Sequence, residues 1–172
     1  MINVGKTHDE VRVVCDQIGT PTYTYDLARL LVDMCETEKY GYYHATNAEL
    51  PEGADANGAK TGYISWYDFC VEIYRQYGLS TKVTPVTTAE YGLSKAARPY
   101  NSRLDKKKLV ENGFEPLPVW TDAVSRYFEG SRYLIEKSNP PSVAGEMQCW
   151  EDFSLLAETA GFEPACQVTP AN

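Results

Sequence analysis

Short apolar segments of strand type alternate with amphipathic helical segments along this chain of 172 residues, and this alternation constrains the fold most. The strand-type segments are residues 11–15, 41–46 and 82–86. Between them, apolar side chains recur at helical spacing over residues 25–36 and 65–77. Alternating strands and helices are typical of an α/β protein with a mostly parallel sheet. We therefore predict an α/β fold.

The helix predicted over residues 65–77 has the clearest boundaries. The Ser65 hydroxyl can accept a hydrogen bond from the amide of Asp68, whose carboxylate suits the positive first turn. Gly78 is expected to end this helix. Downstream, the sequence predicts a helical turn in the connection after residue 87, a short helix over 105–112 capped by Asp105, and a last helix over 121–128 capped by Thr121.

Composition excludes several classes of function. A net charge of -8 and a pI near 4.8 exclude nucleic acid and anionic membrane surfaces as partners. No apolar stretch is long enough to span a membrane. The cysteines are odd in number and widely spaced, which argues against a disulfide framework or a zinc site and favours reduced thiols in a cytoplasmic protein; they are Cys15, Cys35, Cys70, Cys149 and Cys166.

Basic residues are concentrated in one short segment of this acidic chain. Six of the sixteen lysines and arginines lie there, with only Asp105 among them. Such a cluster suits a small anion such as a diphosphate, and it equally suits a solvated, lysine-rich start of a helix. Both interpretations stay open for these residues, which are Lys95, Arg98, Arg103, Lys106, Lys107 and Lys108.

Several motifs occur in an order that resembles a known family. TPTYTYDLA (20–28) and YHATN (43–47) precede RPYNS (98–102), which is followed by a short helix and GFEPLP (113–118). Together they resemble the C-terminal, substrate-binding half of dTDP-4-dehydrorhamnose reductases, which are extended short-chain dehydrogenases/reductases acting on a nucleotide sugar. The resemblance covers residues 1–129, with 47–62 as an insertion loop, and leaves a tail over 130–172 without an assigned role.

The resemblance implies a Rossmann-like fold that is incomplete without its N-terminal cofactor half. No G-x-G-x-x-G follows a strand, and the Y-x-x-x-K spacings at Tyr91–Lys95 and Tyr133–Lys137 lie outside the position of the family's catalytic pair. We therefore assign no catalytic residue, cofactor-binding residue or metal ligand to this chain. The strand over 41–46 would lie at an uncovered sheet edge, so we expect marginal stability or association through that edge.

The resemblance also carries substrate-binding residues onto this sequence. In the family's R-P-x-[DN] motif, the arginine reaches the nucleotide's phosphates, and the acidic or amide residue at the end of the motif lies near the ribose. The loop DQIGTPTY (16–23) lines the substrate cleft in the family, although it could equally pack the turn before the next helix, with Thr24 as its cap. The implied binding residues are Arg98, Asn101, Ser102, Gln17, Thr20 and Tyr23.

The resemblance also implies a function for this chain. Its members use NADPH to reduce a dTDP-4-keto-6-deoxy sugar in dTDP-rhamnose biosynthesis, and this chain would supply nucleotide-sugar binding. Its partners would be the dTDP-sugar and either the N-terminal half or a homodimer partner, and magnesium is possible because some relatives bind it at a dimer interface. The alternatives are a non-catalytic regulatory module, as in a methionine adenosyltransferase regulatory subunit, or an inactive truncated product.

Overall fold

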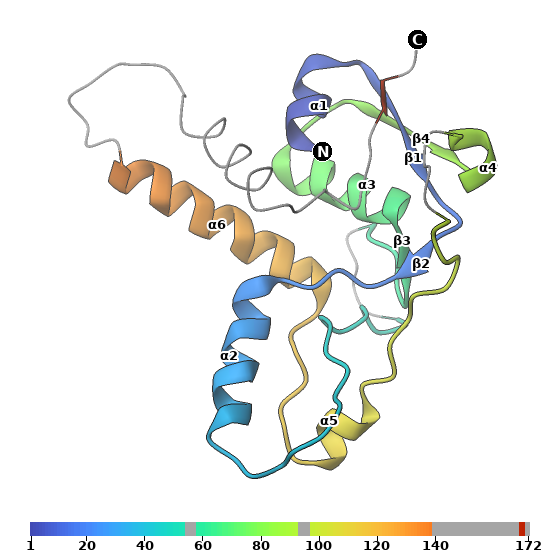
Figure 1. The fold of residues 1–172 in the computed structure, drawn as a ribbon. Coiled ribbons are helices and arrows are strands. Elements are labelled where there is room, and N and C mark those ends of the chain that lie inside the picture. Colours follow the sequence, from blue (N-terminus) through green and yellow to red (C-terminus); the bar gives the residue numbers. More distant parts are fainter. Residues whose placement is uncertain (54–57, 93–96, 139–168, 171–172) are drawn as a thin grey trace.

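The main sheet of the computed structural model, which describes residues 1–53, 58–92, 97–138 and 169–170, has the strand order β4-β1-β5. β1 (Glu10–Val14) and β4 (Lys82–Val86) pair in parallel along their whole length. β5 (Thr169–Pro170) adds a short antiparallel strand to the other side of β1. Helices α1 (Ile2–Thr7) and α3 (Trp66–Tyr77) pack beside these strands (Figure 1). The predicted α/β fold and the strands over 11–15 and 82–86 are confirmed.

The first and last turns of α3 form as the sequence predicts. The Ser65 hydroxyl accepts a hydrogen bond from the Asp68 amide, and the Asp68 carboxylate accepts one from the Ser65 amide. This reciprocal capping box satisfies amides that the first helical turn leaves without carbonyl partners. Gly78 ends the helix at φ 80°, a left-handed conformation that side chains other than glycine adopt rarely.

The core of the sheet is an apolar cluster between β1 and one face of α3. Val11 and Val13 are fully buried on β1, and they pack against Cys70 and Tyr74 of the helix. Burying one such side chain stabilises a fold by roughly 1.5–3 kcal/mol. The alternation of buried and partly exposed residues along β1 therefore fixes which side of the strand faces the helix.

α6 (Trp120–Ser138) is longer than the sequence predicted. The expected helix began after a Thr121 cap and ended near Phe128, and both expectations are wrong. Trp120 is already helical, and its amide donates to the carbonyl of Ala48. No proline follows Pro118 until Pro140, and a single glycine does not end a helix. The start of α6 packs on α3 through Trp120, Val124 and Phe69.

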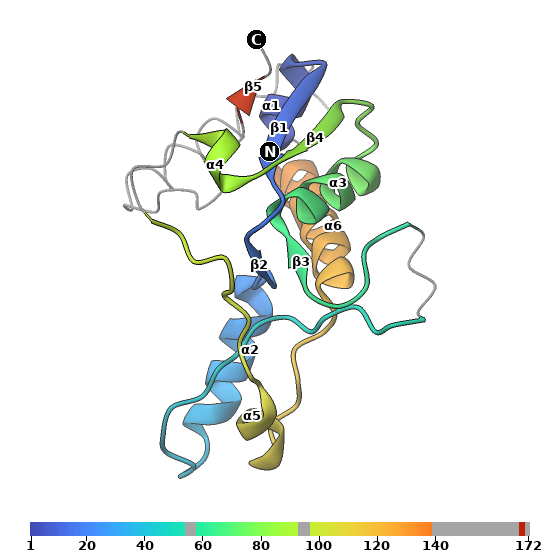
Figure 2. The same ribbon diagram turned by 90° about the vertical axis from the view of Figure 1, so that its right-hand side faces the viewer.

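A second region lies below the sheet and contains α2 (Thr24–Cys35) and α5 (Lys107–Glu111) (Figures 1 and 2). The predicted helices over 25–36 and 105–112 are confirmed, but Asp105 is not the N-cap of α5, because the helix begins after Lys106. The Asp105 carboxylate lies one residue earlier and accepts a hydrogen bond from the Lys107 amide. The helical turn predicted after residue 87 is α4 (Thr88–Tyr91). The two lower helices meet at a small apolar cluster made of Leu30, Leu109, Phe114 and Leu117.

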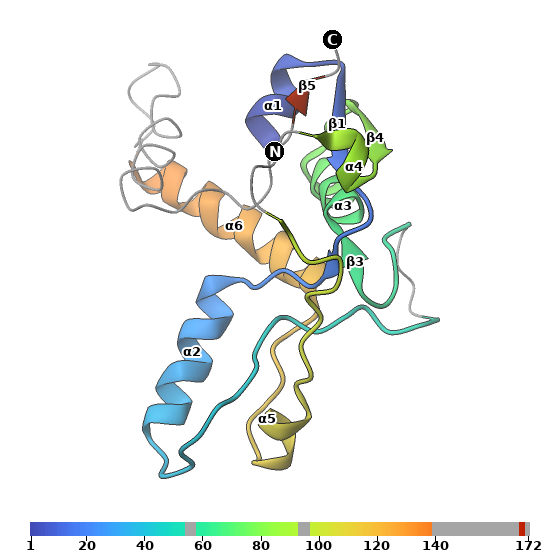
Figure 3. The same ribbon diagram turned by 45° about the vertical axis from the view of Figure 1, so that its right-hand side comes forward.

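The predicted strand over residues 41–46 is wrong. This segment crosses the lower region as irregular backbone between α2 and α5 (Figure 3). Tyr43 and Ala45 pack on the Leu30 cluster, whereas Tyr42 and His44 are exposed. Their alternation therefore reflects packing of one side of an extended chain on two helices, and it does not reflect strand pairing. The expected edge strand at 41–46 is consequently absent from the described sheets.

Candidate functional site

Two segments predicted to bind substrate lie side by side, although about eighty residues separate them in sequence. The Ile18 amide donates to the carbonyl of Tyr100, and the Ser102 amide donates to the carbonyl of Ile18, both at 2.9 Å. A Cβ atom at Gly19 would lie 3.0 Å from the Ser102 hydroxyl, so this close approach favours glycine. β2 (Ile18–Gly19) also pairs with β3 (Ile64–Ser65). The 16–23 loop is thereby held between two other segments.

Three of the six predicted residues line one small cavity of about 70 Å³, and they are Gln17, Thr20 and Ser102. Its volume suits a few water molecules rather than a nucleotide. The Gln17 side-chain amide donates to the Thr88 hydroxyl at 3.1 Å. Thr88 in turn donates to the Asp16 carboxylate through its amide and its hydroxyl. These bonds fix the start of the loop against α4.

Tyr23 lies apart from these residues. It lines a separate cavity of about 420 Å³ between α3 and α6, and its ring contacts Tyr127 edge-on at 6.2 Å. Its amide donates to the Asn47 side-chain oxygen at 2.6 Å. Thr24 starts α2 without a side-chain cap, so that part of the packing alternative is wrong. The structure therefore gives Tyr23 a packing position at the start of α2.

A buried polar cluster that the sequence reasoning missed holds the loop in place. Asn47 is fully buried and donates to Asp26 at 2.7 Å and to the carbonyl of Pro118 at 3.0 Å. Arg126 donates to both oxygens of Asp26, at 2.6 and 2.8 Å. The Arg126 hydrogen bonds hold the pKa of Asp26 below its ordinary value, and Asn47 adds to this effect against the opposing effect of burial. The sequence did contain a signal for two of these residues, because Asn47 lies in the YHATN motif and Asp26 lies in the TPTYTYDLA motif.

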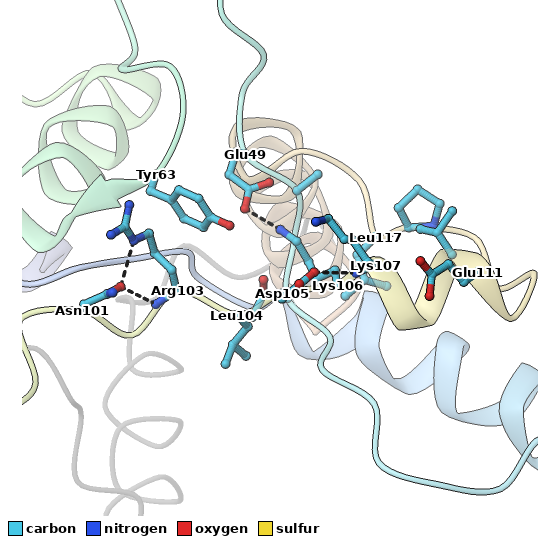
Figure 4. A pocket seen from close by; sticks show the side chains of 14 residues that line it. Glu49, Tyr63, Asn101, Arg103, Leu104, Asp105, Lys106, Lys107, Glu111 and Leu117 are labelled. Carbon is cyan, nitrogen blue, oxygen red and sulfur yellow. Dashed lines mark hydrogen bonds and ion pairs between the residues drawn. The ribbon is translucent and has the colours of Figure 1, made fainter.

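A larger groove of about 830 Å³ opens beside the two joined segments (Figure 4). Asn101 of the predicted site lies on its wall, and the first turn of α5 forms its far end. The groove also collects three members of the basic cluster and three acidic residues, which are Arg103, Lys106, Lys107, Glu49, Asp105 and Glu111. It is therefore polar, charged and open at the surface, and its size is that of a small-molecule site.

The remaining basic residues lie elsewhere. The Lys108 ammonium lies 4.8 Å from the centre of the Tyr43 ring, outside the groove. Arg98 is exposed and lines none of the three cavities described above, and it has no hydrogen bond or ion pair among the described residues. Lys95 lies outside the described residues. The structure thus places half of the predicted basic cluster in one groove.

The charges in the groove are partly compensated. The Lys106 ammonium lies 2.6 Å from the Glu49 carboxylate, and both side chains are largely buried. Burial raises the pKa of Glu49, but the Lys106 hydrogen bond and further hydrogen bonds outweigh burial and leave the pKa below its ordinary value. Burial and the neighbouring Glu49 raise the pKa of Tyr63. At neutral pH the groove therefore holds an ionised Glu49 and a neutral Tyr63 phenol.

The described residues give no support for a metal site, for a Y-x-x-x-K catalytic pair or for a membrane-spanning helix. Within the described ranges, no group of three or more His, Cys, Asp and Glu side chains could hold a metal ion. Tyr91 is buried in an apolar cluster with Val14 and Val86, away from the groove. The side chains of Tyr133 and Lys137 lie outside what the structure describes. No helix in the described part is both long and apolar enough to cross a bilayer.

Known proteins are similar to this chain in sequence and in fold. The family model for the RmlD substrate binding domain matches residues 1–132. The spore coat polysaccharide biosynthesis protein SpsK of Bacillus subtilis is 36% identical over 129 residues, which cover 75% of this chain and 40% of SpsK. The dTDP-4-dehydrorhamnose reductase of Aggregatibacter actinomycetemcomitans is 35% identical, over 67% of this chain and 39% of that enzyme.

Solved structures agree with this match. A dTDP-4-dehydrorhamnose reductase from Clostridium acetobutylicum superposes with a TM-score of 0.66 at 39% identity, covering 76% of this chain and 42% of that one. The Bacillus anthracis reductase, solved in complex with NADP, gives 0.63 at 34% identity, with 76% and 41% covered. The chain spans about 40% of the length of these relatives. On the family match over most of its length, this chain belongs to the RmlD substrate binding domain family.

Proposed function

We propose that this chain binds the nucleotide sugar for a dTDP-4-dehydrorhamnose-type reductase. The supporting observation is the hydrogen-bonded union of the 16–23 loop with the 98–103 segment beside a charged groove of about 830 Å³. Two segments that the resemblance assigned to substrate binding from sequence alone are joined by hydrogen bonds, and the second of them places Asn101 on the wall of a cavity large enough for a nucleotide. The substrate would be a dTDP-4-keto-6-deoxy sugar, as the names of the relatives suggest.

Within this proposal the predicted residues take different parts. Asn101 lies on the groove wall, and Arg98 would reach the phosphates from the exposed segment beside it. Gln17, Thr20 and Ser102 line the small cavity, and their side chains already bond within the chain, to Thr88, Thr46 and the Ile18 carbonyl. They would therefore act on the ligand by holding the loop beside the groove. Tyr23 supports the loop from behind, because its ring lies in the cavity between α3 and α6.

The described residues do not fit a nicotinamide cofactor. In the Rossmann arrangement a glycine-rich turn after a strand seats the pyrophosphate at a helix N-terminus. Here β1 leads into the 16–23 loop, and β4 leads into the four-residue α4. We therefore propose that NADPH and the hydride transfer belong to a cofactor-binding part or partner, and that this chain contributes the sugar-nucleotide site.

A cytoplasmic location is part of the same proposal. Its support is that Cys15, Cys35 and Cys70 are all free thiols, which suits a reducing compartment. No residue described here supports the magnesium site that the resemblance allowed.

Titration of the folded chain with dTDP and dTDP-rhamnose tests the proposed function. We expect binding that weakens about 10- to 100-fold in Arg98→Ala, because one charge-assisted contact to phosphate is lost. Arg29→Ala is the matched control, since Arg29 is an exposed arginine on α2 outside the groove, and its affinity should equal that of the unaltered chain. A cooperatively folded chain that binds neither ligand would overturn the proposal and favour a regulatory module.

A further inference from the structure

Arg103 is held in the groove in a fixed orientation. The side-chain oxygen of Asn101 accepts hydrogen bonds from the Arg103 backbone amide at 3.2 Å and from its Nε at 2.8 Å (Figure 4). Among the described residues, the two terminal nitrogens of Arg103 have no hydrogen bond and no ion pair. A guanidinium fixed at Nε, with two terminal nitrogens left over, is suited to bind two oxygens of one phosphate group.

The other cations of the groove are less suited to this task. The Lys106 ammonium is already paired with Glu49 at 2.6 Å, so an incoming anion would have to compete with a carboxylate. Lys107 is exposed, and its ammonium is a point charge on a flexible stem. Arg103 therefore combines charge, orientation and unused donors.

Tyr63 provides a planar surface next to this guanidinium. The central carbon of the Arg103 guanidinium lies 5.4 Å from the centre of the Tyr63 ring, and the Lys106 ammonium lies 5.8 Å from it. Tyr63 directly precedes Ile64, which pairs with Gly19 across the two-stranded sheet. The ring is consequently tied to the 16–23 loop, and it lines the groove. An aromatic ring in such a place can stack on a planar base.

We propose that Arg103, positioned by Asn101, binds the diphosphate of the ligand, and that Tyr63 stacks on its base. The ligand class is a nucleoside diphosphate, because the groove pairs a phosphate-binding fork with an aromatic surface. This inference rests on the proposed function. It adds to that function which residue binds the phosphates of the ligand and which residue contacts its base. The inference also gives Asn101 a second role. Besides lying near the ribose, it orients the Arg103 guanidinium.

The test separates the two parts of the ligand by using pyrophosphate and dTDP as probes, with binding followed by amide shifts. We expect Arg103→Ala to weaken both probes about 10- to 100-fold, and Arg103→Lys to recover only part of the loss, since lysine keeps the charge without the fork. Tyr63→Ala should weaken dTDP about 5- to 10-fold and leave pyrophosphate unchanged. Arg29→Ala again serves as the control for removal of a surface arginine.

The outcomes distinguish this inference from the function on which it rests. If dTDP binds and depends on Arg98 while Arg103→Ala binds both probes normally, the proposed function stands and this inference is overturned. If Tyr63→Ala weakens pyrophosphate as much as dTDP, the stacking role is overturned. If the folded, unaltered chain binds no dTDP, both proposals fall together. Retained amide dispersion in Arg103→Ala shows that any loss is local, and the exposure of Arg103 leads us to expect it.

Discussion

The sheet region and the helical region of this molecule are stabilised in different ways. The sheet region, made of β1, β4, α1 and α3, buries an apolar cluster under a parallel strand pair with a full ladder. The helical region, made of α2, α5 and residues 41–50, has isolated bridges at Ala48 and Leu50 in place of a strand ladder, and its apolar cluster is smaller. It also contains the polar cluster in which Asn47 and Arg126 bond to the buried Asp26.

The difference matters because the candidate site lies where the two regions join. The 16–23 loop leaves β1, bonds to the segment that carries Asn101 on the groove wall, and enters α2. At its start it is bonded to α4 through Asp16 and Gln17, and at its end to Asn47. Polar bonds of this kind are specific in geometry but costly to lose when they are buried. We therefore expect the site to be more sensitive to the polar cluster than to substitutions at the surface of the sheet region.

The largest effect should come from Asn47→Ala. The substitution leaves the Tyr23 amide, the Pro118 carbonyl and part of the Asp26 carboxylate without their partner in a buried place. We expect a loss of about 3 kcal/mol in the free energy of unfolding, measured with urea. Asn3→Ala is the control, because Asn3 is exposed in α1, and it should change stability by less than about 0.5 kcal/mol. Equal stabilities of the two variants would mean that the helical region does not depend on its polar cluster.

An intermediate effect should appear as pH dependence through Asp26. Because its pKa is lowered in the folded state by Arg126, the stabilisation it provides is complete above the unfolded pKa of about 3.9. It is lost as the pH falls through the lower, folded-state pKa. Asp26→Asn should therefore be less stable by about 2 kcal/mol at pH 7, and the difference should shrink as acid is added. Urea unfolding from pH 7 to pH 2 measures this, and a constant difference at all pH values would contradict the linkage.

Local signals in the sequence predicted the sheet region well. The short apolar run of β1 and the capping residues of α3 act over a few residues, so a window of sequence contains their whole cause. The 41–46 segment failed for the opposite reason. Its apolar, aromatic composition suits a strand, but Tyr43 and Ala45 pack instead on a cluster made by α2 and by α5 with the residues after it. Only the second of these partners is distant in sequence, and no local window of sequence contains it.

The candidate site was predictable only in part for the same reason. Motif resemblance identified the 16–23 and 98–102 segments, and the structure brings them together. It could not show that Asn101 bonds to Arg103, or that Tyr63 faces both Arg103 and Lys106, because these contacts depend on how separate segments fold past one another. Asp26 and Arg126 are 100 residues apart in sequence, so no local pattern could predict that they pair.

The smallest effect should come from Ser65→Ala, which acts in the sheet region. The substitution removes the hydroxyl that accepts a hydrogen bond from the Asp68 amide, while the Asp68 carboxylate keeps its bond to the backbone at residue 65. Half of the capping box remains, so we expect a loss of about 1 kcal/mol. Ser80→Ala, at an exposed serine beyond the end of α3, controls for the serine itself. A loss in Ser65→Ala as large as that in Asn47→Ala would abolish the contrast between the two regions, because a single helix cap would then matter as much as the buried polar cluster.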